Sequence, residues 1–205
     1  MALLSSTVSI MRYKVEGKIK DPVLETVANS LKENAILEID GDNSEKTVGW
    51  TLFDNPFSPD FEHSSFVVGP YLVFSLRIDK KTIPPKIIKK HYFLESTKQL
   101  AESGRQYLSR NEKKMIKDQV VDILSLRIPA TPNIYDLIWN YEKSSLLFFS
   151  TLKAANEELE SLFLKSFQCS LIRLFPFTLA DLMIDLSDAE RDLLSSLSPV
   201  DFTEQ

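Results

Sequence analysis

The 205-residue sequence has a formal net charge of −5 and is 43% hydrophobic, a composition that excludes an intrinsically disordered chain. No apolar run reaches the roughly 18 residues that a membrane-spanning helix needs, and the N-terminus lacks the basic start of a secretory signal. A single cysteine, Cys169, excludes an internal disulfide and a multi-cysteine metal site. We therefore expect a cytoplasmic protein without a membrane partner.

The first part of the chain predicts the order β-α-β-β. A strand is expected over residues 7–16, followed by a helix with Asp21 as its N-cap and Pro22 in its first turn. The apolar stripe of this helix, spaced by four, consists of Val23, Val27 and Leu31. Two further strands are expected over residues 47–53 and 66–78.

The middle of the chain predicts a pair of helices. A double proline ends the preceding strand and suits the start of a helix over about 85–103, with Gly104 as its terminator. Ser109 and Glu112 then have the spacing of a capping box at the start of a second helix, which Pro129 ends. The expected apolar face of the second helix consists of Ile116, Val120, Ile123 and Leu124.

The last part predicts the order β-β-α-β. Strands are expected over residues 134–141, 146–151 and 170–175, and Asn156 is the expected N-cap of the helix between the second and the third. The core side of this helix consists of Leu159, Leu162, Phe163 and Phe167. The letters SDAE at 187–190 form another capping box, which predicts a final acidic helix.

This element order predicts an α+β fold with two β/α halves and a protruding basic helical hairpin between them. The expected boundaries are 1–83 for the first half, 84–129 for the hairpin, 130–184 for the second half and 185–205 for the acidic tail. The two halves can join into one antiparallel sheet with helices on one face, or form two ferredoxin-like half-units.

Charge is distributed unevenly along the chain. Residues 77–117 hold twelve Lys and Arg against four Asp and Glu, whereas residues 154–205 hold three against ten. The lysines recur at spacings of three and four, which places each set on one face of its helix. Like charges held so closely favour a polyanionic partner, of which a phosphate backbone is the commonest. The competing interpretation is a lysine face that is merely solvated.

Motifs for catalysis are sparse. The glycines are not clustered into a phosphate-binding loop, and His63 and His91 have no companions at metal-ligand spacing. No short carboxylate cluster of the kind that a two-metal nuclease uses is present. We therefore expect a non-enzymatic protein with no catalytic residue, no metal site and no cofactor. Trp50 and Trp139 lie in strand-like segments and are expected in the core.

Five segments between about Val48 and Leu182 carry a family resemblance through their order, spacing and basic character. They are VGW at 48–50, VFSLRIDKKTIPPKIIKKHYF, LSRNEKKMIKDQVVDIL, IYDLIWNYEKSSLLFFS and LIRLFP. In these segments the sequence resembles the RdgC family of bacterial recombination-associated proteins. The resemblance implies double-stranded DNA binding without sequence preference, by ring-like dimers that enclose DNA and limit access of the RecA recombinase. Some members of the family are described as exonucleases.

Together these observations predict a sequence-nonspecific double-stranded DNA-binding protein of recombination or replication, associated with the nucleoid. We expect a homodimer, paired through strands such as 66–68 and 146–149, that antagonises a RecA-type recombinase. The alternatives are a protein-interaction module that binds an acidic partner, and a metal-dependent exonuclease. The residues expected to contact DNA are Lys80, Lys81, Lys86, Lys89, Lys90, Arg110, Lys113, Lys114, Lys117 and Arg127.

Overall fold

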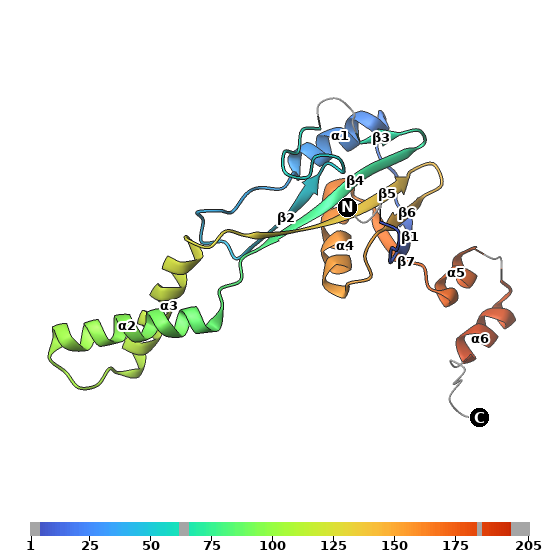
Figure 1. Cartoon of the computed structure of the whole chain (residues 1–205). Coiled ribbons are helices and arrows are strands. Elements are labelled where there is room, and N and C mark those ends of the chain that lie inside the picture. Colours follow the sequence, from blue (N-terminus) through green and yellow to red (C-terminus); the bar gives the residue numbers. More distant parts are fainter. Residues whose placement is uncertain (1–4, 62–65, 184–185, 198–205) are drawn as a thin grey trace.

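The computed structural model describes residues 5–61, 66–183 and 186–197, which form a β-sheet body and a long helical hairpin (Figure 1). The first half contains β1 (Met11–Glu16), α1 (Val23–Glu33), β2 (Lys46–Thr51), β3 (Val67–Val68) and β4 (Tyr71–Lys80). The helical hairpin consists of α2 (Pro85–Ser103) and α3 (Arg110–Ser125). The second half contains β5 (Thr131–Asn140), β6 (Ser145–Phe148), α4 (Lys153–Phe167) and β7 (Ser170–Arg173), and it is followed by α5 (Pro176–Met183) and α6 (Asp188–Ser196). The predicted α+β fold is confirmed.

The two halves share one antiparallel sheet with the strand order β2-β4-β5-β6-β1-β7, and β3 pairs with β4. β1 of the first half lies between two strands of the second half, since Met11 pairs with Phe148 of β6 and Tyr13 pairs with Arg173 of β7. One continuous sheet is therefore formed, and the half-unit alternative is wrong. The expectation that strand 146–149 pairs across a subunit boundary is also wrong, because both edges of β6 are occupied within the chain.

Helices α1 and α4 pack on one face of the sheet and enclose an aromatic core. The Trp139 ring lies 4.8 Å from the Phe163 ring, which lies 4.8 Å from Phe167, and Trp50 meets Phe74 edge-on at 5.1 Å. Such pairs add about 0.5–1.5 kcal/mol each to the free energy that burial provides. The predicted core position of the two tryptophans is confirmed.

The opposite face of the sheet carries buried polar side chains. Arg77 donates two hydrogen bonds to the carboxylate of Asp79, at 2.8 and 2.5 Å, and a third to the carbonyl of Pro56 at 3.2 Å. The Arg77 guanidinium also lies over the Phe57 ring, 5.4 Å from its centroid. Arg77 is thus neutralised inside the body, although it contributes to the positive charge counted along the sequence.

The chain between α1 and β2 lies directly against the backbone of β2. The amide of Ile36 donates to the carbonyl of Trp50, and the amide of Trp50 donates to the carbonyl of Asn34, both at 2.9 Å. Gly49 permits this approach, because a β-carbon there would lie 2.4 Å from the Cα atom of Ile36. The glycine is therefore required by contact rather than by backbone conformation.

Two predicted helix caps are wrong, and one helix was not predicted. α1 begins at Val23 with Pro22 at its N-cap, so Asp21 lies one residue too early to cap it. α4 begins at Lys153, which places Asn156 inside the first turn rather than at the cap. α5 follows Phe175 without the polar cap residues by which a helix start is recognised.

Candidate nucleic-acid interface

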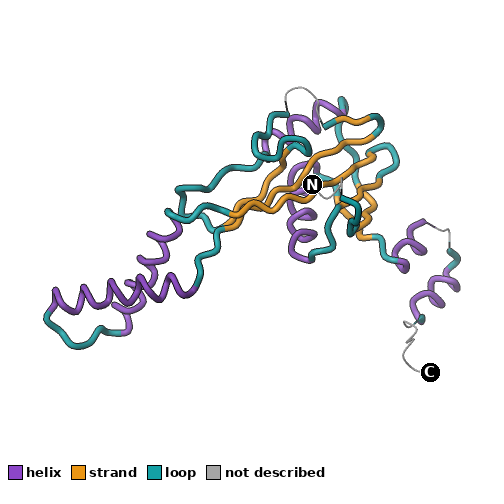
Figure 2. Tube along the Cα trace, viewed as in Figure 1, coloured by secondary structure: helices purple, strands orange, loops and turns teal. Residues whose placement is uncertain are grey.

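Two long strands carry the helical hairpin away from the body (Figure 2). β4 ends and β5 begins at the same level, where Lys80 pairs with Thr131. The helices start as the sequence predicts: α2 extends over 85–103 and ends at Gly104, which adopts the left-handed conformation, and Ser109 caps α3. The hairpin is therefore a projection from the two central strands of the sheet.

A loop of the first half braces the base of the hairpin; we call residues 40–45 the brace loop. The carboxylate of Asp40 accepts from the amide of Ala130 at 2.8 Å, and the side chain of Asn43 accepts from the Ser125 hydroxyl at 3.2 Å. The Lys81 ammonium donates to the carbonyl oxygens of Asp42, at 2.6 Å, and Ser125, at 2.8 Å. These hydrogen bonds fix the direction of the hairpin relative to the sheet.

The two helices of the hairpin share a small apolar core of their own. Its buried members are Leu108, Ile116, Val120 and Leu124, against which Ile83, Ile88, Tyr92 and Leu100 pack. Ile123 was predicted on this face but is 41% exposed. α2 buries none of its residues fully, so most of its surface is available to a partner.

A cleft of about 550 Å³ lies between α2 and α3 on one side of the hairpin; we call it the lysine cleft. It is lined by Pro85, Ile88, Lys89, Tyr92, Lys113, Lys114 and Lys117. The lining combines four ammonium groups with an apolar floor and contains no carboxylate. Cations from two helices that converge on one cleft produce a positive potential there, which attracts anions.

Comparison with known proteins identifies the family of the chain. The model of a family described as "Putative exonuclease, RdgC" matches residues 8–179. The chain belongs to the RdgC family. The match extends over both halves of the sheet and the helical hairpin, and membership makes the chain a recombination-associated protein. No curated protein matches the chain.

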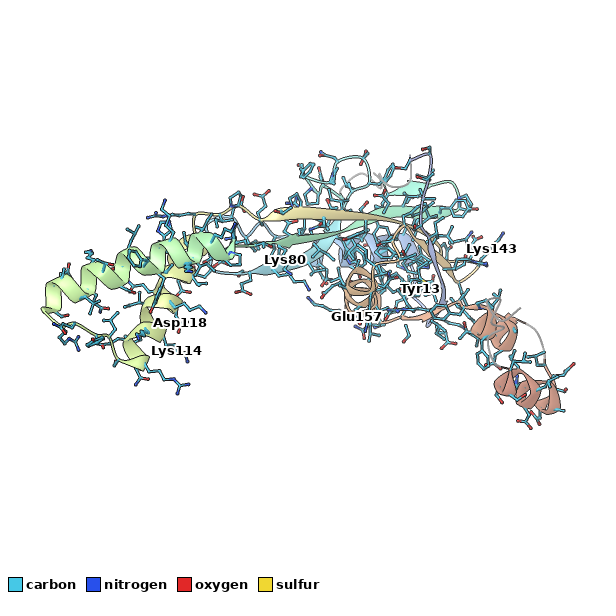
Figure 3. The ribbon with its side chains drawn as sticks, turned by 60° about the horizontal axis from the view of Figure 1, so that its bottom comes forward. Tyr13, Lys80, Lys114, Asp118, Lys143 and Glu157 are labelled. Carbon is cyan, nitrogen blue, oxygen red and sulfur yellow. The ribbon has the colours of Figure 1, made fainter. Side chains whose placement is uncertain are left out.

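The structure brings together four of the ten residues that the sequence predicts to contact DNA in this RdgC chain, namely Lys89, Lys113, Lys114 and Lys117 in the lysine cleft. Figure 3 shows Lys114 on α3 and Lys80 near the junction with the body. Five predicted residues are exposed outside the cleft: Lys80, Lys86, Lys90, Arg110 and Arg127.

Lys81 requires a correction. Its side chain is buried, with 6% exposure, and its ammonium donates hydrogen bonds to carbonyl oxygens of the brace loop and of the end of α3. It cannot reach a phosphate without breaking these bonds, so it is a structural residue of the hairpin base. A buried ammonium needs such acceptors, since an unpaired buried charge is strongly destabilising.

A second groove between α2 and α3 is lined by His91, Leu94, Glu95, Gln119, Val120, Ile123, Leu124 and Arg127. It mixes both charges with apolar side chains, and it contains Arg127, which does not line the lysine cleft. The two grooves therefore offer different surfaces, and only the lysine cleft has charged side chains of a single sign.

Sequence reasoning missed Tyr92 as a residue of the interface. Tyr92 follows Ile88 by four positions and Lys89 by three, so a helical spacing rule places all three on neighbouring parts of α2. That spacing was the signal from which the floor of the cleft could be inferred. Only Lys and Arg residues were predicted to contact DNA, because positive charge can be read from a sequence without the fold, whereas the contribution of an aromatic ring to a cleft cannot.

At the tip of the hairpin, the capping box of α3 lowers the pKa of the Glu112 carboxyl group. The Ser109 amide donates to the Glu112 carboxylate at 2.8 Å, the Ser109 hydroxyl caps the Glu112 amide, and Arg105 donates to the same carboxylate at 2.7 Å. These hydrogen bonds, chiefly those from Ser109, lower the pKa of Glu112 to about 2. Arg105 is thereby paired within the chain.

The parts of the chain that the structure describes show no cluster of three or more His, Cys, Asp or Glu that could hold a metal ion. His63 lies outside the described residues, and His91 lines the second groove. Cys169 is buried, and this burial raises the pKa of its thiol. Within the same described residues, none of the helices has the length and apolar character needed to cross a bilayer.

Proposed function

We propose that this RdgC chain binds double-stranded DNA without sequence preference, and that it acts in recombination or replication at the nucleoid. The observation that supports this most directly is the lysine cleft, which has exposed lysines on two helices of a projecting hairpin and no carboxylate in its lining. Lys86 and Lys90 extend the positive surface along α2.

The chemistry of the cleft favours phosphates over base edges. A lysine ammonium is a compact point charge, whereas recognition of guanine or adenine edges uses the paired donors and acceptors of Arg, Asn or Gln. None of those three residue types lines the lysine cleft. Contacts to phosphate oxygens position a protein on DNA but carry no sequence information.

The test is the salt dependence of binding, measured by fluorescence anisotropy on a labelled blunt duplex. Six contacts, from Lys86, Lys89, Lys90, Lys113, Lys114 and Lys117, give an expected slope of about −5 for log K against log salt. Replacing Lys89, Lys113 and Lys117 by Gln lowers the affinity for every duplex sequence alike. It also reduces the magnitude of the slope by about 0.9 for each lysine replaced.

The matched control is Lys143→Gln, which removes one exposed lysine from the body, far from the hairpin (Figure 3). Its affinity is expected to equal that of the parent chain. Unchanged binding by the triple variant at low salt would show that the lysines form only a solvated face. If the chain instead binds acidic proteins and no DNA, the interaction-module alternative is correct.

We further propose that coating of DNA by this chain limits the access of a RecA-type recombinase. The expected result is that strand exchange slows when the duplex partner is first saturated with the chain, and that the triple Gln variant restores the rate. In the same reactions, metal-dependent shortening of labelled ends would overturn the non-enzymatic assignment.

A homodimer remains part of the proposal. β6 is excluded as a pairing edge, and residues 34–36 hydrogen-bond to the outer edge of β2. The candidate edges in the described sheet are therefore β7 and β3, which lies within the predicted strand 66–68, because each pairs with one strand only. Sedimentation equilibrium is expected to give twice the monomer mass of 23.4 kDa. A single monomeric species at the highest accessible concentration would remove this part of the proposal.

A further inference from the structure

The lysine cleft has an apolar floor that phosphate binding does not explain. Pro85, Ile88 and Tyr92 line the same cavity as its four lysines, and the cavity volume of about 550 Å³ is within the range of small-ligand sites. A phosphate backbone that lies across the lysines needs cations only. The bases of an intact duplex are stacked inside it, so they present no face to such a floor.

We propose that the lysine cleft binds an unpaired nucleotide of a DNA strand, with its base against Tyr92 and Ile88 and its phosphates among the lysines. This inference rests on the proposed function, which it deepens by naming the part of DNA that enters the cleft. Single-strand binding sites combine these two features, an aromatic platform for a base and a positively charged groove for the backbone.

The placement of the side chains suits such a ligand. Ile88, Lys89 and Tyr92 come from α2, whereas Lys113 and Lys117, one helical turn apart, come from α3. A nucleotide between the helices therefore meets cations from both sides. Tyr92 also packs on the core of the hairpin, so its ring is held in place before a base arrives.

The second groove supplies an internal comparison. It lies between the same two helices, but its lining includes Glu95 and only one permanently charged cation, Arg127. A carboxylate repels phosphates, so this side does not suit a nucleotide. Of these two grooves, only the lysine cleft combines a cationic rim with an aromatic side chain in its floor.

The experiment compares a blunt duplex with the same duplex that carries a single-stranded thymidine tail. The parent chain is expected to bind the tailed duplex about 5- to 150-fold more tightly, the range that stacking of one base on an aromatic ring provides. Tyr92→Phe keeps this preference because it keeps the ring. Tyr92→Leu keeps the apolar floor but removes the ring, so this variant is expected to bind the tailed duplex no more tightly than the blunt duplex.

Two outcomes would overturn the inference and leave the proposed function intact: equal affinity of the parent for both duplexes, or a preserved preference in Tyr92→Leu. If the preference is preserved while both affinities fall equally, Tyr92 only supports the hairpin. No binding to either duplex would overturn the proposed function itself.

A second readout uses small probes and needs no duplex. In nuclear magnetic resonance titrations, thymidine monophosphate is expected to shift the ring signals of Tyr92, and inorganic phosphate at the same concentration to shift only signals near the lysines. Equal shifts of the Tyr92 ring signals with the two probes would mean that the cleft binds phosphate alone and does not contact the base. The Tyr92→Phe variant serves as the folded control for the assignment.

Discussion

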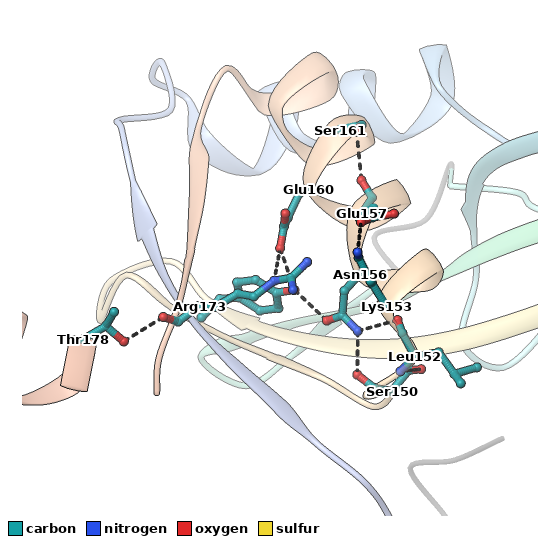
Figure 4. A network of polar contacts seen from close by, with 10 residues as sticks. Ser150, Leu152, Lys153, Asn156, Glu157, Glu160, Ser161, Arg173 and Thr178 are labelled. Atoms are coloured by element: carbon teal, nitrogen blue, oxygen red, sulfur yellow. Dashed lines mark hydrogen bonds and ion pairs between the residues drawn. The ribbon is translucent and has the colours of Figure 1, made fainter. Parts of the chain in front are cut away.

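Tyr13 on β1 donates its hydroxyl hydrogen to the side-chain oxygen of Asn156 on α4 across 2.6 Å, although the two residues are 143 positions apart. Figure 4 shows Asn156 with its other polar partners. Glu160 lies 3.0 Å from the same hydroxyl and accepts from Arg173 at 2.6 Å. The Asn156 amide group donates to the carbonyls of Ser150 and Leu152. This network of hydrogen bonds holds α4, the helix of the second half, against β1, the strand of the first half that lies between β6 and β7.

Replacing Tyr13 by Phe is expected to lower the free energy of unfolding by about 1–3 kcal/mol. The substitution keeps the ring but leaves the buried Asn156 oxygen without its donor, and an unsatisfied buried polar group costs about that much. Urea denaturation followed by tryptophan fluorescence measures the change. Tyr141→Phe, at an exposed position, is the control and should alter stability little. Equal stability of both variants would contradict a structural role for the network.

Replacing Lys81 by Met is expected to lower the free energy of unfolding by about 1.5–3 kcal/mol, the contribution of hydrogen bonds that involve a charged donor. The salt slope of DNA binding should stay the same, since the Lys81 ammonium faces the brace loop and not solvent. Anisotropy titrations and denaturation on the same sample separate the two effects. A shallower slope would show that Lys81 contacts phosphate after all.

Acidification is expected to loosen the start of α3. Glu112 has its pKa lowered from 4.5 to about 2 in the folded chain, so its carboxylate stabilises the folded state fully above pH 4.5. That stabilisation is lost as the pH falls from 4.5 toward 2. The amide signal of Ser109 reports the event, and it should move near pH 2 rather than near pH 4.5. In Glu112→Gln the transition should vanish.

Replacing Gly49 by Ala is expected to destabilise the body by about 1–3 kcal/mol or more, as overpacking of a close contact does. The new methyl group would meet backbone atoms of Ile36 and Ala35, which cannot rotate away as a side chain can. Thr47→Ala, two residues earlier on the same face of β2, is the control. Thermal denaturation that shows no difference between the two variants would mean that the segment after α1 is not held against β2.

The helical hairpin was predictable from the sequence because its signals are local. Pro85, Gly104 and the capping box of Ser109 and Glu112 act within one or two turns, and the structure uses them as predicted. The order β-β-α-β from β5 to β7 was predictable for the same reason, since alternating and helical patterns are properties of short windows. In the first half, the single strand expected over 66–78 is wrong, because this segment forms two antiparallel strands, β3 and β4, joined by a turn at Gly69 and Pro70.

Features that depend on the fold were not predictable in this way. Asp21 and Asn156 have the side chains of helix caps, but tertiary contacts set where those helices begin, and Asn156 serves Tyr13 instead. Charge counting treated Arg77 and Lys81 like the exposed lysines, although partners from distant segments bury both. The position of β1 between β6 and β7 could not be predicted, because the sequences of these strands do not indicate which strands pair with one another.

Because Lys80 and Thr131 are register partners in neighbouring strands, a two-residue turn could join β4 to β5. In topological terms everything between them is one very long loop of the sheet. The entropy of closing a flexible loop rises only with the logarithm of its length, by about 0.6 kcal/mol for each doubling. The sheet can therefore tolerate insertions of many lengths at this position. The distance between the cationic surface and the sheet can then differ between related chains, while the sheet itself stays the same.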